Sequence, residues 1–175
     1  MLDVAVGYNK FAFLGNEFLT WLWYMIQTDE EALQKTTCAF TEISIGQRII
    51  FENYDENALE KIIIKGNKPS FEEGFVALKK GSLITEMQLY CKEGSHEFTF
   101  SIKGESFGLS GIKVPASGSV AFPQDMDGAI LERLYLFEKA TFFVTASFTV
   151  FLKKRVSPEW EAILLPAMKK QIKGL

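Results

Sequence analysis

The chain has 175 residues, of which 47% are hydrophobic and 23% charged, which is the composition of a globular domain and excludes a disordered segment. Its formal net charge of −3 excludes a chain that is basic throughout. Residues 1–78 carry six Lys/Arg against twelve Asp/Glu, whereas residues 79–175 carry thirteen against ten, so the pattern indicates either a basic face or a scatter of solvated charges. We expect residues 1–175 to form a single domain.

Cysteine usage and the N-terminus are typical of a reduced, cytoplasmic protein. Cys38 and Cys91 are too few for a disulfide scaffold, and they do not form a C-x-x-C pair. The first ten residues lack the basic region and apolar core of a secretory signal peptide. The longest uncharged apolar stretch, residues 140–152, is shorter than the roughly 20 residues that cross a bilayer as a helix. We therefore expect that stretch to be buried in the core, and we expect no membrane partner.

The first half of the chain predicts one helix followed by three strands. Residues 15–26 carry large apolar side chains at helical spacing, with Asn16 placed as a cap, and a polar run then ends the pattern. The strand candidates are residues 37–45, 47–52 and 59–65. Gly46 separates the first two, which predicts a hairpin turn at this position.

The second half opens with a short helix from Ser70 to Gly81. Ser70 and Glu73 have the spacing of a capping box, and Gly81 is placed to end the helix. Three further strand candidates follow, at residues 82–92, 97–103 and 107–114. Residues 115–124 are rich in glycine, serine and proline, so we expect a loop here, at the strongest predicted break in the chain.

Residues 127–155 predict one long helix. Its apolar positions recur at spacings of three and four: Ile130, Leu134, Phe137, Thr141, Val144, Phe148 and Phe151. A strand would also suit the β-propensity of residues 141–151, but charged residues continue into this segment without a turn signal, which favours the helix. We expect Phe137, Phe148 and Phe151 to lie in the core. A last helix starts at Ser157 and Pro158, and Pro166 is expected to kink or interrupt it.

These elements predict an α+β fold. The fold contains an antiparallel sheet of about six strands, an N-terminal helix, a short central helix, a long C-terminal helix and a terminal helix.

The sequence contains no recognisable catalytic or cofactor-binding constellation. His96 is the single histidine, and neither cysteine lies at metal-ligand spacing from it. Residues 104–108 match the pattern G-x-S-x-G around Ser106, but an esterase of that kind needs a later histidine, and none follows. We therefore expect no enzyme activity, no cofactor and no metal.

Basic residues gather at three predicted helix ends: Lys79 and Lys80, then residues 153–155, then Lys169, Lys170 and Lys173. Cations at helix C-termini compensate the helix dipole, so this placement has a structural explanation. The functional alternative is contact with phosphates.

Four stretches, taken in order, resemble the recombination-associated protein RdgC family. Residues 14–24 (LGNEFLTWLWY) resemble its "LG-x-EFLTWLW" segment, and residues 77–89 (ALKKGSLITEMQL) resemble its "AL-x-x-GK-x-V-T-x-x-x-L" junction. Residues 130–138 (ILERLYLFE) are similar to "FLERMYLIEE", and residues 156–161 (VSPEWE) to "LSPEWEEE". Only fourteen residues precede Gly15, so the chain is expected to be a short, divergent member that lacks the family's usual N-terminal region.

The resemblance implies a non-enzymatic protein that binds double-stranded DNA with little sequence preference. Proteins of this family dimerise into a ring around the duplex and limit RecA access during recombination. The resemblance therefore implies a homodimer in the cytoplasm, associated with the nucleoid and with recombination proteins as further partners. Ser82 stands where many members have lysine, and the negative net charge also departs from the family.

The hypothesis for the DNA contacts is a basic face that binds backbone phosphates. Its residues are Lys79, Lys80, Lys103 and Lys113, helped by Lys153, Lys154 and Arg155. The alternative is a protein-interaction or self-association module that kept the fold, lost DNA binding and uses exposed aromatic side chains.

Overall fold

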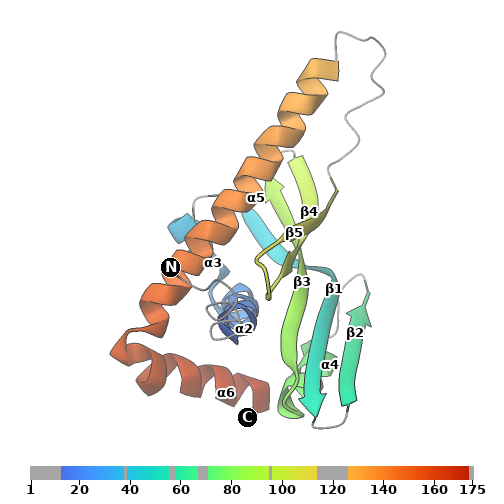
Figure 1. Cartoon of the computed structure of the whole chain (residues 1–175). Coiled ribbons are helices and arrows are strands. Elements are labelled where there is room, and N and C mark those ends of the chain that lie inside the picture. The colour runs from blue at the N-terminus through green and yellow to red at the C-terminus, as the bar shows by residue number, and fades with distance from the viewer. Residues whose placement is uncertain are drawn as a thin grey trace, which may run out of the picture.

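Figure 1 presents the computed structural model, which describes residues 13–37, 39–55, 58–66, 71–94, 96–113 and 126–173. The helices are α2 (Phe13–Thr28), α3 (Glu30–Thr37), α4 (Phe71–Lys79), α5 (Met126–Arg155) and α6 (Leu165–Lys173), with a π-helical turn η2 (Trp160–Leu164) before α6. The strands are β1 (Glu42–Asp55), β2 (Ala58–Lys65), β3 (Leu83–Glu93), β4 (His96–Lys103) and β5 (Leu109–Lys113). The predicted α+β class and the long helix are confirmed.

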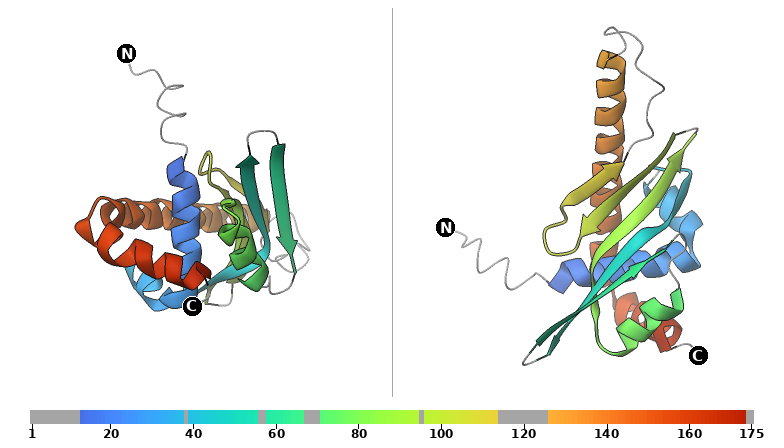
Figure 2. Two further views of the ribbon diagram at one scale, coloured as in Figure 1. Left: turned by 90° about the horizontal axis from the view of Figure 1, so that it is seen from below. Right: turned by 90° about the vertical axis from the view of Figure 1, so that its right-hand side faces the viewer.

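The strands form one antiparallel sheet in the order β2-β1-β3-β4-β5. In the right-hand view of Figure 2 the sheet lies in front of α2 and α5, so these helices cover one of its faces. Alternation along β4 sends Phe98, Phe100 and Ile102 into the core, and Met87 and Leu89 of β3 are buried beside them.

The prediction of about six strands is wrong because β1 is a single strand that runs through Gly46. The register of β1 against β3 shifts between Ile45 and Ile49, which marks a bulge. Gln47 N–H donates to Oε1 of Gln88 at 2.8 Å, and a Cβ on Gly46 would lie 2.8 Å from Cγ of Gln88. The missing side chain of Gly46 therefore leaves room for the Gln88 side chain of the neighbouring strand β3. Gly46 lies within β1 and does not make a hairpin turn.

Helix α3 occupies a segment in which the sequence predicted only a break. Asp29 Oδ1 accepts the N–H of Ala32 at 3.1 Å and so caps the helix. Glu30 Oε1 accepts the N–H of Ile43 at 2.9 Å, and Leu33 is buried. One apolar anchor and one carboxylate thus hold this polar helix against β1.

The predicted ends of the short and terminal helices are largely confirmed. Gly81, at φ +87°, follows α4, and its N–H donates to the carbonyl of Leu78 at 3.0 Å. The proposed cap Ser70 lies outside the described residues. Pro166 lacks an N–H, and the turn before it widens, because Leu165 N–H donates to the carbonyl of Trp160 five residues back.

Aromatic side chains fill the crossing of α2 and α5. The ring centroid of Phe151 lies 5.7 Å from those of Phe18 and Trp21 and 5.6 Å from that of Trp160, and Phe148 lies 5.3 Å from Phe18. Phe151 is fully buried, as predicted. Because aromatic pairs at these separations add to the free energy of burial, this cluster is the main contact between the two helices.

The upper half of α5 extends beyond the sheet in Figure 1, and several of its apolar side chains are exposed, among them Ile130, Leu131 and Leu134. The prediction that Phe137 lies in the core is wrong, since this side chain is 48% exposed. Periodicity identified the buried face only in part, because the side chains that α5 buries include Leu136, Ala140, Phe143 and Ser147, each one position before a predicted one. Of the predicted face, Val144, Phe148 and Phe151 pack against the rest of the described chain.

We expect the Phe151→Ala substitution to lower the free energy of unfolding by about 3–5 kcal/mol, because it opens a cavity in the aromatic cluster. Phe142→Ala is the control, since Phe142 is 56% exposed on the same helix and should change stability by about 0.5 kcal/mol or less. Urea unfolding followed by circular dichroism measures both, and equal losses for the two variants would contradict the assignment of the core.

We expect Gly15→Ala to be destabilising although alanine favours helix. A Cβ on Gly15 would overlap with the carbonyl oxygen of Gly104, so the backbones of α2 and the β4–β5 turn would have to separate. This overpacking costs about 1–3 kcal/mol or more, against a gain of about 1 kcal/mol in helix propensity. Gly128→Ala in α5 meets no atom within 4 Å and should be neutral or stabilising. Urea midpoints compare the two, and a stable Gly15→Ala variant would show that the close approach is absent.

Candidate nucleic-acid interface

The seven predicted phosphate-binding residues lie in three places. Lys79 ends α4 and Lys80 follows it, and residues 153–155 end α5. Lys103 and Lys113 lie on β4 and β5, on the face of the sheet away from the helices, because Lys113 pairs with Thr99 and both alternate with the buried side chains of β4.

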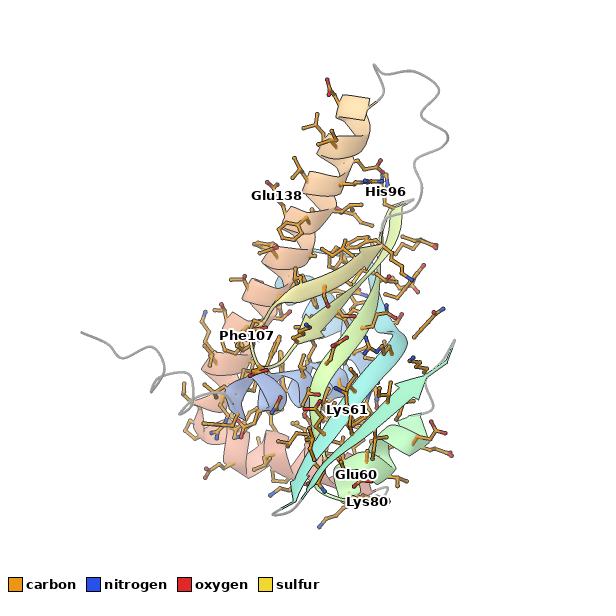
Figure 3. The ribbon with its side chains drawn as sticks, turned by 45° about the vertical axis from the view of Figure 1, so that its right-hand side comes forward. Glu60, Lys61, Lys80, His96, Phe107 and Glu138 are labelled. Carbon is orange, nitrogen blue, oxygen red and sulfur yellow. The ribbon has the colours of Figure 1, made fainter. Side chains whose placement is uncertain are left out.

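Helix α6 connects the end of α4, where Lys79 and Lys80 lie, with the end of α5, where residues 153–155 lie. It runs along the bottom of the molecule in Figure 1, from the end of α5 toward α4, and it contacts α4. Its exposed side chains include Lys169, Lys170 and Lys173. Figure 3 places Lys80 at the same end of the molecule. We call this surface the basic end and define it by seven residues: Lys79, Lys80, Lys153, Lys154, Lys169, Lys170 and Lys173.

The ammonium groups of the basic end make no salt bridge within the described part of the chain. Residues 153–173 carry six Lys/Arg against two Asp/Glu, Glu159 and Glu161. Near α4, the carboxylates of Glu72 and Glu73 at the start of that helix reduce the net positive charge. The surface is therefore positive in excess, and its charges are available to an anionic partner.

Arg155 differs from the lysines around it because its charge is already paired. Its Nε donates to Oε2 of Glu17 at 2.8 Å, and its guanidinium lies 5.3 Å from the ring centroid of Trp160. These contacts join α5 to α2 and to the start of the terminal helix. The structure therefore gives Arg155 a packing role beside the basic end.

The outer face of the sheet carries charges of both signs. Lys103 on β4 lies opposite Glu86 on β3, and Glu86 Oε1 accepts a hydrogen bond from Nη1 of Arg48 at 2.9 Å. The same face holds an ion pair between Lys61 and Glu52, whose atoms are 2.9 Å apart. Lys103 and Lys113 therefore belong to a mixed surface, apart from the basic end.

The tip of the β3–β4 hairpin holds α5 through a second charged cluster. Glu93 Oε1 accepts hydrogen bonds from Nζ of Lys139 at 2.8 Å and from the hydroxyl of Tyr135 at 3.0 Å. Nδ1 of His96 lies 3.0 Å from Oε1 of Glu132. The hydrogen bond that Lys139 donates to Glu93 raises the pKa of Lys139, which is opposite to the shift that a catalytic lysine needs. This cluster attaches the hairpin to the helix.

Ser106 lies in the turn between β4 and β5, and its Oγ accepts the N–H of Gly108 at 3.2 Å. A nucleophile elbow requires a strand followed by a helix, whereas here a strand follows the serine. Burial raises the pKa of the Cys91 thiol well above its ordinary value, so it stays protonated at neutral pH. Among the described residues no group of three His, Cys, Asp or Glu side chains is placed to hold a metal ion.

Two hollows lie near α5 and α6. A cleft of about 290 Å³ between the β4–β5 turn and α5 is lined by Phe107, Leu109, Phe137, Thr141, Val144 and Thr145. A second, of about 370 Å³, lies between α2, α3, β1 and α6. Within α5, residues Ile130–Arg155 are long and apolar enough to cross a membrane by length and composition, a property that core helices of soluble proteins share.

No family model, curated protein or solved structure matched the chain.

Proposed function

We propose that this chain binds double-stranded DNA without sequence preference, through the basic end and without enzyme activity. The supporting observation is that lysines from α4, α5 and α6 converge on one end of the molecule with their charges unpaired within the described part of the chain. Lysine ammonium groups contact phosphates as point charges and read no base edges, which suits binding that is independent of sequence.

The dimensions of this surface suit a duplex. Residues 160–173 extend roughly 20 Å at 1.5 Å per residue, a length that covers about six base pairs. The resemblance to the RdgC family adds the biological setting, in which the protein acts at the nucleoid in the cytoplasm, modulates RecA access and takes part in recombination and replication as a homodimer.

A second candidate function, a protein-interaction or self-association module, is favoured by a different observation. Large apolar side chains on the upper half of α5 are about half exposed, among them Ile130, Leu134 and Phe137. Contiguous apolar surface of this kind marks interaction sites.

We expect duplex affinity to fall steeply with salt, by about 10²–10³-fold between 50 and 200 mM if the basic end neutralises roughly five phosphates. Fluorescence anisotropy with two labelled duplexes of unrelated sequence measures this, and both should give the same affinity. An absence of binding at 50 mM salt would refute the proposal.

The double variant Lys169→Gln/Lys170→Gln localises the site. It should weaken binding to every duplex and reduce the salt slope by about two, because each lysine accounts for roughly one released counterion. Lys103→Gln/Lys113→Gln is the matched control, since it removes the same charge from the mixed face of the sheet. Equal losses in the two doubles would mean that net charge, and not the basic end, governs binding.

A further inference from the structure

Beside the face that α5 buries through Leu136, Ala140 and Phe143, the helix carries a second apolar face that the described chain covers along only half of its length. Side chains at alternating spacings of four and three residues make a continuous seam, as in helices that pack against another helix. Its lower members, Val144, Phe148 and Phe151, pack against α2 and the β4–β5 turn. The upper members lie in solvent, and we call them the open seam: Ile130, Leu134, Phe137 and Thr141.

The open seam and its neighbours are comparable in area with the largest apolar patch of a typical monomer, a kind of patch that is often functional. Ile130, Leu134 and Phe137 are each about half exposed, and Leu131 and Phe142 flank them. Large side chains present about 150–250 Å² each when they are fully exposed, so these five expose roughly 400 Å². This is about half of the roughly 800 Å² that each partner buries in a standard interface, and the polar side chains between them supply further area.

The same face also carries the complement of the open seam. The cleft of about 290 Å³ between α5 and the β4–β5 turn is lined by Phe107, Phe137 and Thr141 among others. Phe107 lies beside α5 in Figure 3. Ile130 projects from the same face of the helix three turns above Thr141. A ridge and a hollow on one face satisfy the self-complementarity that a two-fold symmetric interface requires.

We propose that a second copy of the chain packs antiparallel on the open seam, with Ile130 of each copy in the cleft of the other. A two-fold axis between residues 135 and 136 then sets Leu134 opposite Phe137 of the partner copy and Ile130 opposite its Thr141. This interface is apolar and lies apart from the basic end, so it does not depend on DNA binding.

The antiparallel direction follows from what already occupies the lower half of α5. In a parallel pair the lower halves of the two helices would lie side by side, where α2 and the β4–β5 turn cover the seam. In an antiparallel pair the lower half of each helix extends away from the other copy, so only the open halves meet.

Sedimentation velocity of the full chain, without DNA and in about 0.5 M salt, tests the association. We expect a concentration-dependent species of twice the 19.8 kDa chain mass, because burial of apolar surface persists at a salt concentration that abolishes phosphate contacts. Leu134→Glu should raise the dissociation constant of the dimer at least 100-fold. Leu59→Glu is the matched control, since Leu59 on β2 is 56% exposed against 53% for Leu134.

A monomer at all concentrations, or a dimer that survives both Leu134→Glu and Ile130→Glu with unchanged circular dichroism, would overturn the proposal. Neither result bears on DNA binding, which anisotropy reports separately. The salt dependences also differ, because duplex affinity falls with salt whereas apolar association does not.

Cysteine cross-linking tests the register. The double variant Ile130→Cys/Thr141→Cys should form covalent dimers under mild oxidation, because the two positions face each other across the interface, whereas within one helix they lie about 16 Å apart. The single variant Ile130→Cys should form no more covalent dimer than the parent chain does. Efficient dimerisation of that single variant would indicate a parallel pair and overturn the antiparallel arrangement.

Discussion

The packing of α2 across α5 is the contact on which the rest of the structure depends. Phe18 and Trp21 of α2 interlock with Phe148 and Phe151 of α5, and Trp160 extends the cluster to the start of the terminal helix. Arg155 adds an ion pair with Glu17 at the same crossing. Because rings at these separations resist sliding, the cluster fixes the angle and height of α5 against the sheet, and with them the start of α6.

Both proposed surfaces follow from this single fixed crossing. Below it the chain turns and sends α6 back toward α4, which gathers lysines from three helices at one end. Above it α5 continues beyond the sheet, and there the residues that the structure describes leave its apolar seam exposed. The charged and apolar surfaces therefore lie at opposite ends of one helix. Substitutions at one should not disturb the other, since distant sites contribute nearly independently.

Local signals in the sequence predicted the helices except α3 and most strands, and the misses depend on tertiary contacts. Gly81 ends α4 because a positive φ suits glycine, and this can be read from the chain. Gly46 is also a glycine, but its role depends on the side chain of Gln88 on β3, a strand that is distant in the sequence and adjacent in the sheet. Periodicity likewise predicted the helix α5, but the face that packs on the sheet carries Leu136, Ala140 and Phe143, so Phe137, one position after Leu136, was wrongly expected in the core. For the candidate site, each basic cluster can be identified in the sequence. The contact between α4 and α6, which brings two of these clusters together, cannot be predicted from it.

The two proposals together constrain how such a dimer would meet DNA. Antiparallel pairing through the upper halves of α5 sets the two basic ends at the far extremes of the assembly, because each lies beyond the aromatic crossing of its own copy. Two separated phosphate-binding surfaces reinforce each other only when one ligand can reach both. A short duplex would then engage one basic end at a time, whereas a long or looped duplex could engage both and gain affinity without any new contact. This geometry favours bridging of distant duplex segments over a ring closed tightly around a single one.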